Sequence, residues 1–145
     1  CISIHVASGY PGDPALQTGV AGELHRPEEH QYNFNVDHGA DDDVFIACLD
    51  AAGDIIDSYA PDVILVAAGA DGHTGVGNLG QIANYTERGY RYAANLIADK
   101  AIAYANGRVI IGGAGGYQPL KETPETWALV VEEIYNRVSA QEGRN

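Results

Sequence analysis

Two side chains that could do chemistry, Asp71 and Tyr117, each follow an apolar segment typical of a buried strand. Asp71 lies in a turn with glycines on both sides, directly after the apolar residues 64–68, and Tyr117 follows the glycine-rich residues 112–116. In open α/β sheets, ligands bind in the crevice outside the carboxyl ends of the strands. A carboxylate there can hold a metal ion or a basic group, and a tyrosine hydroxyl can donate its proton to a developing oxyanion.

Each of these features also has a purely structural explanation. Asp71 could be a turn or cap aspartate, and Tyr117 could be a core tyrosine after a turn. His73 could ligate zinc, although a histidine in a glycine-rich loop is more often a surface or supporting group. The glycine run could cradle a phosphate, but it does not match the dinucleotide-binding spacing. Cys1 could be an N-terminal nucleophile, and the alternative is a thiol buried in a strand.

The segments that must position these residues alternate between strand and helix patterns. The alternation predicts an α/β fold with a parallel sheet flanked by helices and joined by right-handed crossovers. The strands are predicted at residues 1–6, 31–36, 64–68 and 108–111. The helices are predicted from residues 41–43 to the residue before Pro61, from the N-cap Thr86 to Gly107, and from the N-cap Thr123 with Pro124 in its first turn.

The helical segments carry two further expectations about burial. The three aspartates at residues 41–43 are interpreted as a solvated helix start rather than a metal site, because negative charge is favourable near the positive end of a helix dipole. The last helix should turn an apolar stripe toward the core. The residues of that stripe are Trp127, Val130, Val131, Ile134 and Val138.

Composition limits the classes of function. The 145 residues suffice for a single domain over residues 1–145, and 20 Asp and Glu against 8 Lys and Arg give a formal charge of −12. Such a charge repels phosphate backbones and anionic lipid surfaces, which disfavours nucleic-acid and membrane binding. No stretch approaches the roughly 20 apolar residues of a membrane span. With only two cysteines, a cytoplasmic protein is expected.

Taken in order, several motifs resemble the C-terminal half of the histone deacetylase family. These motifs are Ser3-Ile4-His5, Tyr10-Pro11-Gly12, residues 32–36, residues 61–73, residues 86–90 and Gly115-Gly116-Tyr117. The family includes bacterial acetoin-utilisation proteins and acetylpolyamine amidohydrolases. The resemblance covers residues 1 to about 138. It implies an arginase-like α/β fold, a zinc-activated water and hydrolysis of an N-acetyl amide of the acetyl-lysine or acetylpolyamine type.

The resemblance also assigns roles at the two turns. Asp71 falls on the third zinc ligand of the family. Tyr117 falls on the catalytic tyrosine that polarises the amide carbonyl and stabilises the oxyanion. Gly115 and Gly116 let the backbone turn tightly enough to aim Tyr117 inward, and Tyr10 falls on an aromatic residue of the acyl-lysine channel.

Potassium sites are implied nearer the start of the chain. Ser3, through its hydroxyl, and Ile4, through its carbonyl, fall on the family's inner potassium site, while Tyr32 falls near the outer one. These three assignments rest on the resemblance alone.

The departures from the family pattern limit what the chain should do by itself. In the family, the Asp-x-His pair that binds zinc and the His-His general base lie upstream of the residues that Ser3 matches, and no such residues precede Ser3 in this sequence. Residues 76–79 also replace the usual Asp-Pro-Leu. One aspartate cannot hold a catalytic zinc, which needs three protein ligands. Zinc is therefore expected to be absent or substoichiometric and the chain alone inactive. The alternative function is a non-catalytic, self-associating or small-molecule-binding module, with a homo-oligomer formed through an exposed strand edge.

Overall fold

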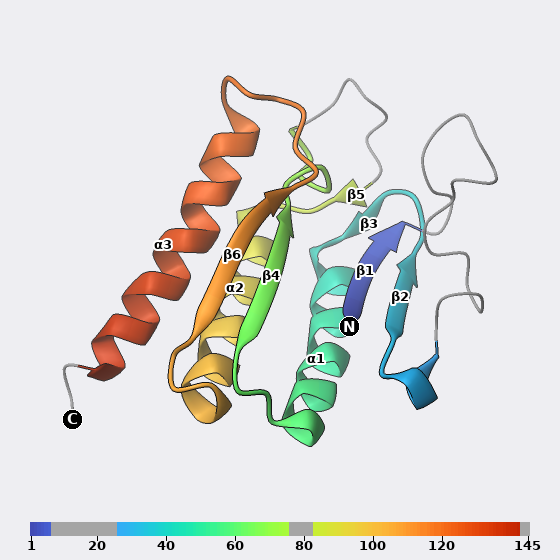
Figure 1. Ribbon diagram of the computed structural model, residues 1–145. Helices are drawn as coiled ribbons and strands as arrows, with labels where there is room; N and C mark the ends of the chain where they lie inside the picture. Colours follow the sequence, from blue (N-terminus) through green and yellow to red (C-terminus); the bar gives the residue numbers. More distant parts are fainter. Residues whose placement is uncertain (7–25, 76–82, 143–145) are drawn as a thin grey trace.

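The computed structural model describes residues 1–6, 26–75 and 83–142. Its elements alternate between strands and helices, as the sequence predicts (Figure 1). The strands are β1 (Ile2–Val6), β2 (Tyr32–Val36), β3 (Ala40–Asp41), β4 (Ile64–Gly69), β5 (Ala83–Asn84) and β6 (Val109–Ala114). The helices are α1 (Asp42–Tyr59), α2 (Glu87–Tyr104), α3 (Glu122–Glu142) and a single 3₁₀ turn, η2 (Pro27–Glu29).

All strand pairs are parallel, which confirms the predicted α/β class. β1 pairs with β2, β3 with β5, and β4 with β6. The expectation of one continuous sheet is not met within the part of the chain that is described, because β1 and β4 have no hydrogen bonds to each other. Both strands therefore keep one edge without a partner strand among the described elements.

Among the described elements, helices cover one face of the β4–β6 ladder and leave the other without a helix. Side chains alternate in exposure along both strands, and the shielded side faces α2, which lies behind the ladder in Figure 1. On the other side Leu65 is 72% exposed and Ile110, its neighbour in the paired register, is 61% exposed. A Cβ added at Gly112 would meet nothing within 4 Å. We call Leu65, Ala67, Ile110 and Gly112 the open face.

The helix starts follow the capping rules at two of three places. Asp41 caps α1 by accepting hydrogen bonds from the amides of Asp43 and Val44, and Thr86 caps α2 as predicted. α3 instead begins at Glu122, so the predicted N-cap Thr123 lies inside the first turn. Its hydroxyl is occupied elsewhere, since it accepts from the amide of Gln118.

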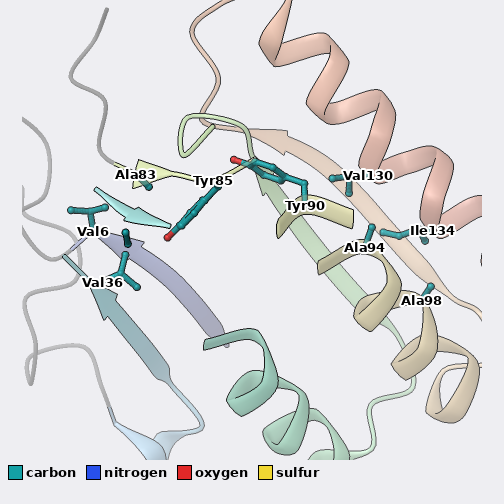
Figure 2. Close-up of a cluster of buried hydrophobic side chains, with 10 residues drawn as sticks. Val6, Val36, Ala83, Tyr85, Tyr90, Ala94, Ala98, Val130 and Ile134 are labelled. Carbon is teal, nitrogen blue, oxygen red and sulfur yellow. The ribbon is translucent and has the colours of Figure 1, made fainter. Parts of the chain in front are cut away.

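The core cluster extends from the ends of β1 and β2, through Tyr85 and Tyr90, to the contact between α2 and α3 (Figure 2). Alanines on α2 bring the helix backbone close to its neighbours, while Tyr85 and Tyr90 are the largest residues of the buried cluster. Val131 was predicted to be buried but is 46% exposed. Val130 and Ile134 fill the contact with α2, so Val131 falls beside the stripe rather than on it. The labelled core residues of Figure 2 are Val6, Val36, Ala83, Tyr85, Tyr90, Ala94, Ala98, Val130 and Ile134.

Candidate functional site

Asp71 and the turn carrying Tyr117 lie at the same edge of the β4–β6 ladder. The last pair of this parallel ladder joins Gly69 to Ala114, so both chains leave the ladder side by side. Just beyond it, the amide of Ala70 donates a 2.5 Å hydrogen bond to the carbonyl of Gly115. The two segments therefore stay connected past the end of the strands.

The predicted glycine turn is shorter than the sequence pattern suggests. β6 continues through Gly112 and Gly113 as far as Ala114, because these residues pair with β4. The chain turns only at Gly115, whose φ is +20°. A Cβ at Gly115 would overlap the carboxylate of Asp71. Only glycine lets the carboxylate lie directly against the backbone of this turn.

Tyr117 follows that turn and is 48% exposed, so it is not a core tyrosine. Asp71 is half-buried. The Asp71 carboxylate, which lies against Gly115, and the exposed phenol of Tyr117 thus belong to the same edge of the ladder. This arrangement can place a bound cation or basic group at the carboxylate while the hydroxyl remains available to a ligand from solvent.

His73 is held by structural partners next to Asp71. Its Nδ1 accepts a hydrogen bond from the amide of Gly75 at 3.0 Å, and its ring stacks on Tyr90 with centroids 6.0 Å apart. Burial, with the negative charge of Asp71 as the second cause, raises the pKa of Tyr90 well above its usual range. Tyr90 therefore stays a neutral phenol beneath this loop.

The described residues do not fit a zinc ion by themselves. Among residues 1–6, 26–75 and 83–142, no group of three or more His, Cys, Asp or Glu side chains is placed to hold a metal. Asp71 supplies one carboxylate, whereas a catalytic zinc takes three protein ligands and keeps one open position.

The residues assigned to potassium lie within strands of the β1–β2 ladder. Ser3 and Ile4 belong to β1, and Tyr32 lies on β2 opposite Ile2. The Ser3 hydroxyl is 2.9 Å from Nδ1 of His5. Potassium binding at these positions stays a prediction. The predicted channel residue Tyr10 and residues 76–79 lie outside the described residues.

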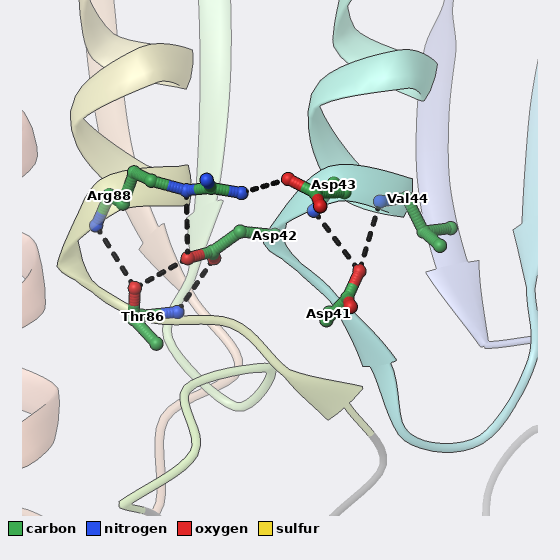
Figure 3. A network of polar contacts seen from close by, with 6 residues as sticks. All are labelled: Asp41, Asp42, Asp43, Val44, Thr86 and Arg88. Atoms are coloured by element: carbon green, nitrogen blue, oxygen red, sulfur yellow. Dashed lines mark hydrogen bonds and ion pairs between the residues drawn. The ribbon is translucent and has the colours of Figure 1, made fainter.

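Sequence reasoning missed the role of Asp42, the second of the three aspartates. It is only 7% exposed, and its carboxylate accepts hydrogen bonds from the amide of Thr86 at 2.8 Å and from the Thr86 hydroxyl at 2.5 Å (Figure 3). Arg88 forms an ion pair with the same carboxylate and another with Asp43. The prediction that these aspartates are solvated is thus correct for Asp41 and Asp43, which are exposed, and wrong for Asp42, which is buried.

A signal for this burial is present in the sequence. Asp42, Phe45 and Leu49 recur at i, i+3 and i+7, which puts the aspartate on the inward stripe of α1. Through Thr86 the carboxylate fixes the start of α2. The segment just before it is also tied to the Asp71 loop, because Tyr85 and His73 form a bridge. Asp42 therefore helps to anchor the loop from a distance.

Two further observations concern Cys1 and the helices. Cys1 is exposed, so the interpretation of its thiol as buried in a strand is wrong. Among the helices that the structure describes, none is both long and apolar enough to cross a bilayer.

Solved deacetylase structures share this fold. The HD domain of HDA15 superposes with a TM-score of 0.71 at 24% identity, covering 94% of this chain and 37% of that one. The histone deacetylase Clr3 gives a TM-score of 0.68 at 23% identity over 92% of this chain and 22% of its own. The acetylpolyamine aminohydrolase from Burkholderia pseudomallei gives a TM-score of 0.64 at 22% identity, covering 96% of this chain and 37% of that one.

Sequence comparison gives the family. Acetoin utilization protein AcuC of Bacillus subtilis (strain 168) is 32% identical in an alignment of 140 residues that covers 92% of this chain and 34% of AcuC. The chain thus spans about a third of that relative's length. The family model for the histone deacetylase domain matches residues 1–134. The chain belongs to the histone deacetylase domain family.

Proposed function

We propose that this chain contributes Asp71 and Tyr117 to a zinc-dependent deacetylase site that hydrolyses an N-acetyl amide of the acetyl-lysine or acetylpolyamine type. The observation that carries the proposal is the contact between the Asp71 carboxylate and Gly115, which fixes the carboxylate against the turn leading to Tyr117. Family membership supports the class of reaction.

Each of the two side chains has a defined task in such a site. Asp71 would provide a negatively charged oxygen ligand to the zinc, which activates a water for attack when it is bound. The Tyr117 hydroxyl would donate a hydrogen bond to the substrate carbonyl as negative charge develops on its oxygen. The remaining metal ligands and a general base must come from a further polypeptide segment, so the 145-residue chain alone is inactive.

A chimera tests this function directly. The full chain replaces the segment of AcuC that it matches, so that AcuC supplies the rest of the domain. We expect the chimera to hydrolyse an acetyl-lysine peptide or an N-acetylpolyamine in the presence of Zn²⁺. Removing one oxyanion donor costs on the order of 10²- to 10³-fold in kcat, so Tyr117→Phe should lower kcat by about that factor.

The controls separate chemistry from folding. Asp71→Asn should abolish hydrolysis while leaving the far-ultraviolet circular dichroism of the chimera unchanged. Tyr135→Phe removes a hydroxyl from an exposed tyrosine on α3 and should leave hydrolysis unchanged. A folded chimera that is active and insensitive to both Asp71→Asn and Tyr117→Phe would refute the proposal.

The open face favours a second function, self-association. Parallel sheets are normally covered on both faces, whereas Leu65 and Ile110 expose most of their apolar surface here. We propose that the isolated chain covers this face, or the free edge of β1, by forming a homodimer or a larger homo-oligomer.

A further inference from the structure

Trp127 of α3 contacts both segments that leave the β4–β6 ladder. Its indole Nε1 donates a 2.8 Å hydrogen bond to the carbonyl of Ala68 in β4, three residues before Asp71. Its ring also lies over β6, since a Cβ at Gly113 would be 2.9 Å from the indole Cζ2. One side chain thus spans the two strands at the point where they end.

Thr123, one helical turn earlier, holds the other side of the Tyr117 turn. The buried Thr123 hydroxyl accepts a hydrogen bond from the amide of Gln118 at 3.1 Å, and the Thr123 amide donates to the Gln118 carbonyl at 3.3 Å. Its methyl group also fills the space beside Gly116. The residues on both sides of Tyr117 are therefore fixed to the first two turns of α3.

The β4–β6 ladder does not need these contacts in order to form. Its two strands are paired along six residues of each by their own backbone hydrogen bonds. The hydrogen bonds of Trp127 and Thr123 lie at the end of the ladder and beyond it, because Trp127 bonds to Ala68 near the end of β4 and Thr123 bonds to Gln118, directly after Tyr117. Their effect falls on the relative placement of Asp71 and Tyr117.

We propose that Trp127 and Thr123 are positioning residues that set the Tyr117 turn against the Asp71 strand. This inference rests on the proposed deacetylase role of that pair. It gives α3 a task beyond packing, because the helix clamps the two segments that carry the reacting groups.

Amide hydrogen exchange of the 145-residue chain tests the clamp without any need for activity. The informative amides are Ala70, which donates to Gly115, and Gln118, which donates to Thr123. Trp127→Phe keeps an aromatic ring and removes the donor, and Thr123→Val keeps the shape and removes the hydroxyl. The matched control is Tyr135→Phe on the exposed side of α3.

Loss of one hydrogen bond weakens local protection by about a factor of ten. We expect Trp127→Phe to accelerate exchange at Ala70 and Thr123→Val to accelerate it at Gln118 by roughly that factor. Amides of α1 and α2 should keep their rates in both variants, and Tyr135→Phe should change none. Unchanged rates at Ala70 and Gln118, or an equal acceleration across α1 and α2, would overturn the proposal.

A second variant and a kinetic measurement keep the test decisive. If Trp127→Phe does not fold, Thr123→Val alone decides, because it changes few atoms. In the active AcuC chimera, either variant should lower kcat and leave KM unchanged, as expected for a residue that orients the oxyanion donor. An inactive chimera would bear on the proposed function alone, since the exchange rates in the 145-residue chain do not depend on catalysis.

Discussion

At the scale of single residues, the site depends on Gly115, because the Asp71 carboxylate occupies the space that a Cβ at this position would need. A side chain at Gly115 would overlap the carboxylate, whereas Gly112 in the same run faces open space. In the sequence, residues 112–116 are four glycines and one alanine, and nothing in it indicates which glycine must lack a side chain. The difference arises from the neighbours that each glycine meets in the folded chain.

These two glycines give a matched pair of substitutions. Gly115→Ala should destabilise the chain by roughly 1–3 kcal/mol, because the added methyl group displaces Asp71 from the turn. Gly112→Ala should change the free energy of unfolding by no more than about 0.5 kcal/mol in either direction. Urea denaturation of both variants measures the difference, and equal effects would contradict the contact described for Asp71.

Tyr85 gives a prediction about alkaline pH. Burial, followed by the nearby negative charges of Cys48 and Asp42, raises the pKa of Tyr85 to about 12. Since the folded chain holds this proton more tightly than the unfolded chain does, the contribution to stability is complete below the ordinary pKa of about 10. It is lost as the pH rises through about 12.

Tyr85→Phe should therefore move the midpoint of alkaline unfolding to higher pH. The phenyl ring can keep the stacking on Phe45, whose centroid lies 4.2 Å away. Circular dichroism between pH 8 and 13 follows the transition, and Tyr135→Phe serves as the exposed control. An unchanged midpoint in Tyr85→Phe would show that Tyr85 does not limit alkaline stability.

At the scale of elements, the starts of α1 and α2 are joined through one buried carboxylate. Asp42 accepts from both the amide and the hydroxyl of Thr86, so its loss leaves two donors without their acceptor. Asp43 has an 80% exposed side chain and pairs with Arg88 at the surface. The two neighbouring aspartates thus make very different contributions to stability.

Asp42→Ala should lower the free energy of unfolding by about 2–4 kcal/mol, since buried donors lose a charged acceptor. Asp43→Ala should cost about 1 kcal/mol or less, because exposed ion pairs contribute little. Chemical denaturation gives both values. A cost for Asp43→Ala that equals the cost for Asp42→Ala would argue against the network of Figure 3.

The sequence predicts elements better than it predicts their connections. Apolar periodicity and the N-cap Thr86 place the start of α2 correctly. The helix ends at Tyr104 with Ala105 as its C-cap, slightly before the predicted stop at Gly107, which adopts a φ of +73°. The short strands β3 and β5 were missed because two residues are too few for a periodic pattern. The start of α3 was misplaced because Thr123 bonds to Gln118, a partner outside any capping pattern.

At the scale of the whole molecule, one apolar face of the parallel β4–β6 ladder is not covered by any element that the structure describes. The strand pattern predicts parallel pairing, and the family resemblance predicts the fold that the solved structures share. Neither the strand pattern nor the resemblance could predict the exposure of Leu65 and Ile110, because a run of apolar residues occurs in strands with one covered face as well as in strands with two. The sequence did point to Asp71 and Tyr117, since residues that follow parallel strands gather at one edge.

Self-association through uncovered surfaces should be visible in solution. We expect light scattering at micromolar concentration to give the mass of a dimer or a larger assembly. If the open face mediates contact, Leu65→Asn combined with Ile110→Thr should shift the mass toward the monomer. Leu120→Ala, which changes an exposed leucine that is not part of the open face, should leave the mass unchanged. A monomeric unsubstituted chain would contradict the expectation.

The zinc content of the chain, alone and in the AcuC chimera, tests the central claim most directly. The claim is that Asp71 is one ligand of a metal site whose other ligands lie on a further segment. Metal analysis after dialysis should find far less than one zinc per 145-residue chain and one per chimera. Asp71→Asn should remove the zinc from the chimera, and Tyr117→Phe should retain it. Stoichiometric zinc in the isolated chain, or a chimera whose zinc survives Asp71→Asn, would contradict the claim.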